Sequence, residues 1–330
     1  MYRSKITGLG FHVPDRILKN DDLKQWMDTS DEWIRERSGI QERHWVSEKE
    51  AASDLALAAS KKAMIMAGVG ADEIDLVIVA TISSDYFFPG VANQLQSKLG
   101  LRTVGTFDIK VACSAFVYGL SIADQFIKTG QHKTILIVGA EAQSKYIDLT
   151  TRGRDMGVLF GDGAGAAILQ QSGDESGILS THIHSDGADM KNLWMEAPGT
   201  SGNNWMNRET LKNGLHHPYM NGREVFRNAV RRFPEVIHEA LEENNLSIED
   251  IKLVIPHQAN YRISQAVAKR LGVGMDVVYS NIHKYGNTTA ASIPIALTEA
   301  HAEGRIERGD HIILAAFGAG YSWASAAIRW

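Results

Sequence analysis

The stretch AMIMAGVGADEIDLVIVA, residues 63–80, decides the fold, because the chain contains a second version of it. The second version is ALEENNLSIEDIKLVIPH, residues 240–257, and the two superpose without a gap at an offset of 177 (240 − 63 = 177). Further along, TILIVGA at 134–140 matches HIILAAF at 311–317 at the same offset (311 − 134 = 177). Two unrelated strand–helix units can resemble each other once by chance, but chance rarely keeps one register at two separate places. The sequence therefore predicts a tandem duplication.

The duplication divides the chain into two halves, which we place at 1–171 and 172–330. In both halves, apolar runs typical of buried strands alternate with segments of helical periodicity, which predicts an α/β fold. The predicted strands are 7–13, 75–82, 106–112, 133–140, 165–171, 179–185, 252–257, 276–282, 311–318 and 323–330. The predicted helices are 52–68, capped by Ser53, 223–245, with a kink or break at Pro234, 260–272 and 292–304. Repeated halves usually pack against each other, and a binding site often lies where they meet.

Residues 186–221 interrupt the alternation of strands and helices. The segment is rich in Gly, Asn and Trp, and a loop of this length in a compact domain is either functional or disordered. Its large side chains Trp194, Met195 and Trp205 argue against disorder. We therefore predict an extended cover loop that lies over part of a pocket.

The composition excludes several classes of protein. The 330 residues are 44% hydrophobic and 22% charged with a formal net charge of −5, so no basic excess points to nucleic acid. The single cysteine excludes a disulfide framework within the chain and fits a reducing compartment. The first residues, MYRSKITGLGFHVP, lack the apolar region of a secretory signal, and no run of 18 apolar residues predicts a membrane span. We expect a cytoplasmic protein that does not bind membranes.

The only cysteine, Cys113, lies in FDIKVACSAFVYGL, residues 107–120, where a predicted strand gives way to a predicted helix. If the helix begins there, its first N–H groups and its dipole favour the thiolate form of the cysteine. The neighbouring residues Ala112, Ser114 and Ala115 are small, so that a substrate can approach the sulfur. The alternative is a buried cysteine that only fills the core.

Three other segments carry candidate catalytic groups. His257 follows the apolar run of a predicted strand, at the end where open α/β sheets bind their ligands. Asn287 lies in a Gly-Asn-Thr-Thr turn before a helix, where an ordinary helix cap is the alternative. The turn Gly-Ala-Gly at 318–320 can bring backbone N–H groups to a developing oxyanion. A cysteine with a distant His and Asn fits covalent acyl chemistry, but the spacing does not separate a hydrolase from a transferase.

At these residues the chain resembles the 3-oxoacyl-[acyl-carrier-protein] synthase III family, the ketoacyl synthases that start fatty-acid synthesis. The resemblance covers the whole chain and is carried by the motifs TSDEWI (29–34), FGDGAGAA (160–167), PHQAN (256–260) and YGNT (285–288). It implies a thiolase-like fold, in which two duplicated halves form a five-layered α-β-α-β-α arrangement. It also implies a homodimer that needs no metal or redox cofactor, with acyl-CoA and malonyl-acyl carrier protein as substrates.

The resemblance also implies a catalytic mechanism. Cys113 takes an acyl group from acyl-CoA, and the backbone N–H groups of Cys113 and Ala319 form the oxyanion hole. His257 and Asn287 bind the thioester carbonyl of malonyl-acyl carrier protein and assist its decarboxylation. The resulting carbanion attacks the acyl-cysteine and gives 3-oxoacyl-carrier protein, CoA and CO2.

Binding residues follow from the same resemblance. The residues implied to bind CoA are Trp33, Arg37, Arg152 and Asn260. The residues implied to dock the acidic carrier protein are Arg262, Lys269 and Arg270. Phe88 matches an aromatic residue that reaches across the dimer and closes the acyl pocket, which implies a short primer of acetyl to roughly four carbons.

Three alternatives to fatty-acid initiation stay open on the sequence. The first keeps the fold and the three catalytic residues but serves an acceptor of specialised metabolism, and the long cover loop is the feature that suggests it. The second is a Cys-His-Asn hydrolase, which releases free acid. The third is a non-catalytic module that binds acyl carrier protein.

Overall fold

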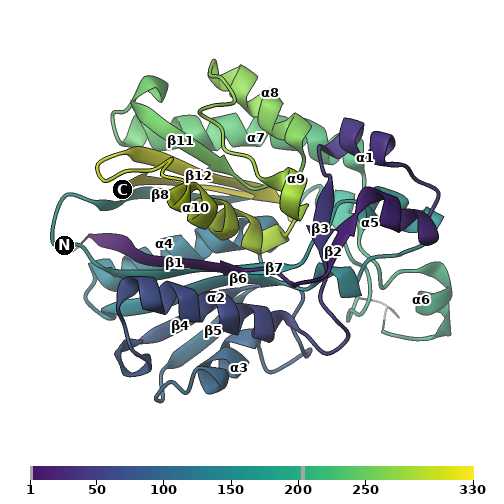
Figure 1. Ribbon diagram of the computed structural model, residues 1–330, viewed down its shortest axis with the longest axis horizontal. Coiled ribbons are helices and arrows are strands. Elements are labelled where there is room, and N and C mark those ends of the chain that lie inside the picture. Colours follow the sequence, from purple (N-terminus) through teal and green to yellow (C-terminus); the bar gives the residue numbers. More distant parts are fainter. Residues whose placement is uncertain (1–2, 202–204) are drawn as a thin grey trace.

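The computed structural model describes residues 3–201 and 205–330, so residues 202–204 of the predicted cover loop lie outside the described residues. Two mixed sheets dominate the fold (Figure 1). The first has the strand order β1-β7-β6-β4-β5 and the second has the order β11-β12-β13-β8. All strands of the first sheet come from residues 4–171, and all strands of the second come from residues 177–329.

The strand and helix bounds are as follows. The first sheet contains β1 (Ser4–His12), β4 (Leu76–Ala80), β5 (Gly105–Ile109), β6 (Thr134–Glu141) and β7 (Gly163–Gln171). The second contains β8 (Gly177–Ser185), β11 (Ile251–Pro256), β12 (His311–Gly318) and β13 (Ser322–Arg329). Two small ribbons pair β2 (Ile17–Lys19) with β3 (Glu42–His44), and β9 (Leu193–Trp194) with β10 (Tyr219–Met220). The helices are α1 (Asp31–Ser38), α2 (Ala52–Ala67), α3 (Val91–Lys98), α4 (Ala115–Lys128), α5 (Arg154–Gly157), α6 (Arg208–Asn213), α7 (Gly222–Glu243), α8 (Tyr261–Leu271), α9 (Ile282–Tyr285) and α10 (Ser292–Ala302).

The central strands are apolar on both faces because helices cover both faces of each sheet. Every residue of β4 and of β6 is buried. Helices α2 and α3 cover the outer face of the first sheet, α7 and α8 cover the outer face of the second, and α4 and α10 lie between the sheets (Figure 1). Continuous apolar strands are expected where no face meets water. The five-layered α-β-α-β-α arrangement predicted from the resemblance is confirmed.

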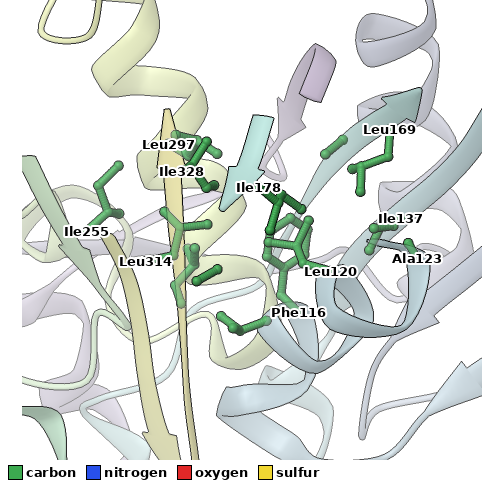
Figure 2. Close-up of a cluster of buried hydrophobic side chains, with 14 of the residues drawn as sticks. Phe116, Leu120, Ala123, Ile137, Leu169, Ile178, Ile255, Leu297, Leu314 and Ile328 are labelled. Atoms are coloured by element: carbon green, nitrogen blue, oxygen red, sulfur yellow. The ribbon is translucent and has the colours of Figure 1, made fainter. Parts of the chain in front are cut away.

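The innermost layer joins the two sheets through one hydrophobic core. Figure 2 shows Phe116 and Leu120 of α4 close to Leu314 of β12 in the second sheet. On the other side of α4, Ile137 of β6 belongs to the first sheet and to the same core. Burying a side chain such as Phe116 or Leu120 stabilises the fold by about 1.5–3 kcal/mol. The core therefore holds the two sheets in a fixed relation.

The duplicated register is visible in the elements themselves. The 3-10 turns at Ala71–Glu73 and Ile248–Asp250 are 177 residues apart (248 − 71 = 177). Strands β6 and β12 keep the same offset (311 − 134 = 177). The 3-10 turns η3 (Ala112–Ser114) and η8 (Thr289–Ala291) keep it too, and each opens on a non-glycine residue with positive φ, 45° at Ala112 and 50° at Thr289. The prediction of two duplicated halves is thus confirmed at the level of local backbone conformation.

Glycine residues let η8 and α10 approach the first sheet closely. A Cβ atom at Gly139 of β6 would lie 2.3 Å from the carbonyl oxygen of Ala290. A Cβ atom at Gly165 of β7 would lie 2.7 Å from Cβ of Pro294 in α10. No side chain fits at either position, so the second half contacts backbone of the first.

Three local predictions were wrong. Residues 276–282 form no strand, because the segment makes only an isolated bridge between Val278 and Val254 before it turns away. Ser53 does not cap α2, which begins one residue earlier; its hydroxyl instead donates to Asp85. Helix α7 continues through Pro234, so the predicted break does not occur, and buried residues such as Phe233 and Ile237 lie on either side of the proline.

The segment 186–221 contains β9, α6 and β10. Strand β9 pairs with β10, and the side chains of Leu193 and Met220 in this ribbon line a cavity described below. In the described part of the chain, no helix combines the length and the apolar character that crossing a membrane requires.

Candidate active site

A cavity of about 450 Å³ lies between elements of both halves. Its buried wall includes Cys113 from the first half and His257, Asn287 and Gly318 from the second. Its rim at the protein surface includes the half-buried Trp33 and the exposed Arg37 and Arg262. The apolar lining between them includes Ile34, Leu193, Met220, Val225, Ala229, Phe233 and Ile263. The cavity therefore connects the surface with the three predicted catalytic side chains.

Cys113 lies in η3, between the end of β5 and the start of α4, and is 8% exposed. The backbone N–H groups of Cys113 and Ala319 both donate to its sulfur and lower the pKa of the thiol. Burial outweighs them and, with the charge of Glu141, raises that pKa to about 12. The expectation that the helix start favours a thiolate was therefore wrong for this state, because the sulfur has lost its hydration. The group is a thiol at neutral pH.

Gly318, the last residue of β12, makes room for the sulfur. A Cβ atom on Gly318 would lie 2.6 Å from Cβ of Cys113 and 3.0 Å from its Sγ. Only glycine fits beside the cysteine at this position. The next residue, Ala319, directs its backbone N–H at the sulfur.

His257 directly follows β11, and its backbone N–H donates to the carbonyl of Ala315 at 2.8 Å. Its Nδ1 lies 2.6 Å from Oγ of Ser292, while its Nε2 is buried without a hydrogen-bond partner in the described structure. Burial lowers the pKa of His257 to about 3. The imidazole is therefore neutral at pH 7, with one unsatisfied nitrogen at a cavity that it lines.

Asn287 is held through both its backbone and its side chain. Its N–H donates to the carbonyl of Leu159 at 2.8 Å, and its C=O accepts from the N–H of Gly161 at 3.1 Å. Its side-chain Oδ1 accepts from the N–H of Thr289 at 2.9 Å. This bond fixes the orientation of the amide and leaves the NH2 end free to donate to a substrate. The motif FGDGAGAA thus supports the turn that presents Asn287.

The rim of the cavity gathers aromatic and cationic side chains. Ser30 of the motif TSDEWI caps α1 by accepting from the N–H of Trp33 at 3.1 Å. The guanidinium groups of Arg37 and Arg154 each lie 4.5 Å from the centroid of the Trp33 ring. Asn260 caps α8 and donates from Nδ2 to the carbonyl of Arg37 at 2.8 Å. Three of the four predicted CoA-binding residues therefore meet at this rim.

Arg152, the fourth, is not brought to the cavity. Its Nε donates to Asp148 at 2.7 Å, and its guanidinium lies against Gly214. Arg154 lies beside Trp33 instead, and the sequence analysis missed it. Both arginines occur in the same TTRGRDMG stretch, so composition alone gave no signal to choose between them.

The predicted docking residues divide between two places on α8. Arg262 lines the cavity rim, with its guanidinium 6.0 Å from the ring of Phe226. Lys269 and Arg270 lie exposed in the last turn of the helix, away from the rim. Arg223 of α7 also lines the rim and was missed by the sequence analysis. Within residues 3–201 and 205–330, neither Arg223 nor Arg262 forms an ion pair.

Phe88 is 80% exposed and does not line the cavity of its own chain. It contacts the ring of Phe87, which is 75% exposed and in turn contacts the ring of Trp205 in the segment 186–221. These aromatic side chains form an exposed apolar cluster. Across the described residues, no group of three or more His, Cys, Asp or Glu side chains is arranged to hold a metal ion.

Known proteins are similar to this chain over its full length. Residues 107–187 match the family model of 3-oxoacyl-[acyl-carrier-protein] synthase III, and residues 241–330 match the model of its C-terminal part. A beta-ketoacyl-[acyl-carrier-protein] synthase III of Xanthomonas campestris is 47% identical, over 99% of this chain and 98% of its own.

Solved structures match as well. The 3-oxoacyl-[acyl-carrier-protein] synthase III of Aquifex aeolicus superposes with a TM-score of 0.92 at 42% identity, over 99% of this chain and all of its own. The beta-ketoacyl-[acyl-carrier-protein] synthase III of Thermus thermophilus superposes with a TM-score of 0.92 at 40% identity, over 99% of each chain. The fold is therefore the thiolase-like fold that was predicted, and the chain belongs to the 3-oxoacyl-[acyl-carrier-protein] synthase III family.

Proposed function

We propose that this protein condenses a short acyl-CoA with malonyl-acyl carrier protein and thereby starts fatty-acid synthesis. One observation carries the proposal: a buried thiol, a neutral imidazole and an oriented amide share one cavity that opens at a cationic rim. The full-length similarity to enzymes named synthase III supports the same acyltransferase activity. The reaction involves no net oxidation or reduction, so acyl-CoA and malonyl-acyl carrier protein suffice and no redox cofactor is required.

The first step transfers the acyl group to Cys113. The sulfur attacks the thioester carbonyl, the bond from that carbon to the CoA sulfur breaks, and the thiol proton leaves with CoA as its thiol. The N–H groups of Cys113 and Ala319 already point at the reacting sulfur. They are thus placed to stabilise the oxyanion that forms on the adjoining carbonyl.

The second step uses His257 and Asn287. Malonyl-acyl carrier protein replaces CoA, and its thioester oxygen accepts hydrogen bonds from Nε2–H of His257 and Nδ2–H of Asn287. The bond to the carboxylate breaks, CO2 leaves, and an enolate forms whose charge these two donors stabilise. Its carbon attacks the acyl-cysteine and the carbon–sulfur bond breaks. The Cys113 thiolate then takes up a proton from water as 3-oxoacyl-carrier protein departs.

The rim is proposed to bind the two carriers of the acyl groups. Trp33, Arg37 and Asn260 are proposed to hold the nucleotide end of CoA, with Arg154 in the place first predicted for Arg152. Arginine pairs well with phosphate and stacks on aromatic rings, and both properties suit a nucleotide. The acidic carrier protein is proposed to dock on Arg262, Lys269 and Arg270.

We also propose a homodimer in which Phe88 of a second copy closes the acyl pocket. The exposed cluster of Phe87, Phe88 and Trp205 supports this arrangement, because exposed apolar patches on soluble proteins commonly mark interfaces. A pocket closed by an aromatic ring takes a short primer. We further propose that the halves meet near residue 171, that residues 186–221 cover the cavity and that the protein is cytoplasmic.

The alternatives predicted from the sequence are less well supported. A hydrolase needs water at the acyl-cysteine, whereas the sulfur lies in a largely apolar cavity. A non-catalytic module has no use for an unsatisfied imidazole nitrogen beside a buried thiol. An acceptor from specialised metabolism is not favoured, because the full-length relatives at 44–47% identity carry the synthase III name.

The test is intact-protein mass spectrometry with a panel of acyl-CoAs from acetyl to dodecanoyl, followed by malonyl-acyl carrier protein. We expect an adduct on Cys113 with the short acyl groups only, which the carrier then discharges as CO2 and 3-oxoacyl product. Cys113→Ser should form no adduct, whereas His257→Ala and Asn287→Ala should acylate but condense about 10²–10³-fold more slowly. Equal loss of acylation in all three variants, or release of free acid, would contradict the proposal.

A further inference from the structure

Ser292, the first residue of α10, lies behind His257 and is 2% exposed. Its Oγ is 2.6 Å from Nδ1 of His257 and 3.3 Å from the backbone nitrogen of Gln258. Among the described residues, 3–201 and 205–330, these are the two hydrogen-bond partners of this hydroxyl. Ser292 lies outside the motifs quoted above, since PHQAN and YGNT both end before it.

The two contacts favour one placement of the hydrogens, because any other placement leaves the buried hydroxyl hydrogen of Ser292 without an acceptor. The N–H of Gln258 can only donate, so the Ser292 oxygen accepts that bond. The hydroxyl hydrogen then has one acceptor within reach, Nδ1 of His257. A neutral imidazole carries one N–H, so an Nδ1 that accepts leaves the hydrogen on Nε2.

We propose that Ser292 is a positioning residue that holds His257 in the Nε2–H tautomer and so makes it a hydrogen-bond donor toward the substrate. The inference rests on the proposed function for its chemical meaning, because a donor is what a developing enolate oxygen requires. In the opposite tautomer, the lone pair of Nε2 would face that oxygen and repel it. The backbone N–H of His257 donates to the carbonyl of Ala315, so the backbone that carries the imidazole ring is fixed beside Ser292.

Neighbouring bonds hold Ser292 and Gln258 in register. The Gln258 side chain donates to the carbonyls of Pro256 at 2.7 Å and Tyr279 at 3.2 Å, and its Oε1 accepts from Ser280 and from the N–H of Asn281. Gln258 therefore ties the loop that follows β11 to the segment that leads to Asn287. With its side chain satisfied there, the backbone N–H of Gln258 is left for Ser292.

The wild-type protein provides the first test. Nitrogen-15 NMR of protein labelled at histidine distinguishes a protonated from an unprotonated ring nitrogen, and His257→Gln identifies the signals of His257 by their loss. We expect Nε2 to be protonated and Nδ1 to be unprotonated near pH 7. A protonated Nδ1 in the wild-type protein overturns the inference without any variant of Ser292.

Variants separate the tautomer from the fold. Ser292→Ala removes the donor to Nδ1, whereas Ser292→Thr keeps a hydroxyl at the same place. For Ser292→Ala we expect a rise in the Nδ1–H form and about 10–100-fold slower decarboxylation, with acyl transfer to Cys113 retained. Ser292→Thr should restore both the tautomer and the rate. Ser325→Ala is the matched control, because it deletes a buried serine hydroxyl that donates to Val236 at 2.8 Å outside the cavity.

The outcomes distinguish this inference from the proposed function. If Ser292→Ala keeps the Nε2–H tautomer and wild-type decarboxylation, the inference is wrong while the function stands. If the tautomer shifts in Ser292→Ala but the wild-type protein does not decarboxylate malonyl-acyl carrier protein, the function is wrong and the positioning role of Ser292 stands. Loss of acylation together with decarboxylation would contradict a role limited to His257.

Discussion

Single atoms decide how much room the reacting sulfur has. Gly318→Ala would place a methyl group 2.6 Å from Cβ of Cys113, closer than real carbon atoms approach, so the cysteine must shift. Because a displacement of about 1 Å in an active site can cost about 10²-fold in rate, we expect at least that loss in the rate of acylation. Intact-protein mass spectrometry over time measures the rate.

Gly187→Ala is the control for that experiment, since nothing lies within 4 Å of a Cβ atom there. It should acylate at the wild-type rate. Normal acylation by Gly318→Ala would mean that the turn at 318–320 moves freely, and would argue against a preformed oxyanion hole.

Glu141 predicts a pH dependence of stability. The carboxyl is fully buried and accepts hydrogen bonds from Ser83, Gln143 and the N–H groups of Ile82 and Ala290, yet burial raises its pKa from 4.5 to about 7. Between these values the unfolded chain releases the proton while the folded chain keeps it. Stability therefore falls as pH rises from 4.5 to about 7, by about 3 kcal/mol at 1.36 kcal/mol per unit of pKa.

Glu141→Gln cannot titrate, so the difference in unfolding free energy between the two proteins isolates this carboxyl from every other group. Urea unfolding at several pH values measures the difference. We expect the advantage of the wild-type protein to shrink as pH rises toward 7 and to stay constant above it. A difference that is independent of pH would show that Glu141 is ionised throughout.

The sequence was informative about single residues only where a motif surrounded them. Cys113, His257 and Asn287 each lie in a short motif, and all three line one cavity. Arg154 and Ser292 were missed for a physical reason. Arg154 differs from Arg152 only in which one the backbone turns toward Trp33, and Ser292 acts through a contact 35 residues away in the sequence.

At the scale of elements, Asn260 joins two helices. Its Oδ1 caps α8 and its Nδ2 holds the carbonyl of Arg37 near the end of α1. Asn260→Ala should lose both, with about 1 kcal/mol less stability from the missing cap and a higher KM for acyl-CoA. Asn260→Asp keeps a cap acceptor but cannot donate to Arg37, so only its KM should rise. Chemical unfolding and acylation kinetics separate the two effects; equal loss of stability in both variants would contradict this division.

Elements were predictable where their residues alone determine them. The apolar strands β4, β6 and β12 and the helices α2, α8 and α10 were found within a few residues of their bounds. The segment 276–282 was mistaken for a strand because Val277, Val278 and Tyr279 favour that conformation. Its hydrogen bonds go instead to a single bridge with Val254 and to the Gln258 side chain, and no local pattern reveals such partners.

At the scale of the whole molecule, contact between the halves sets both stability and the position of Asn287. Gly139→Ala would insert a methyl group 2.3 Å from the carbonyl oxygen of Ala290, a backbone atom that cannot rotate away. We expect about 1–3 kcal/mol of destabilisation from overpacking, and slower decarboxylation because η8 carries the N–H that orients Asn287. Thermal or chemical unfolding and release of CO2 measure the two effects.

Gly119→Ala in α4 is the matched control. Its new methyl group would lie 3.2 Å from Cγ2 of Ile137, a side chain that can adjust, and alanine is the better helix former by about 1 kcal/mol. Its stability should be close to that of the wild-type protein. If both glycine variants lose the same stability, the packing of η8 on β6 has no special importance.

The sequence predicted the architecture better than the rim of its cavity, because duplication leaves a register that can be counted. The offset of 177 was found in two pairs of segments, and the same offset recurs in η3 and η8, which no sequence similarity had indicated. The rim depends on where long side chains such as Arg152 and Arg223 finally lie. In the segment 186–221, α6 and β10 keep the offset from α1 and β3 (208 − 31 = 177 and 219 − 42 = 177), although the sequence analysis found no similarity there.

The turns η3 and η8, which both open on a non-glycine residue with positive φ, occupy corresponding positions in the two halves but have different surroundings. Cys113 corresponds to Ala290 (290 − 113 = 177), and Gly318, which faces the cysteine, corresponds to Glu141, which binds the N–H of Ala290 (318 − 141 = 177). One pair places the Cys113 side chain against Gly318, which has no side chain of its own. The corresponding pair joins the backbone N–H of Ala290 to the carboxyl of Glu141 by a hydrogen bond. The duplicated turn thus serves two purposes in one molecule. In the first half, η3 carries the cysteine, and in the second half, η8 carries the N–H group that orients Asn287.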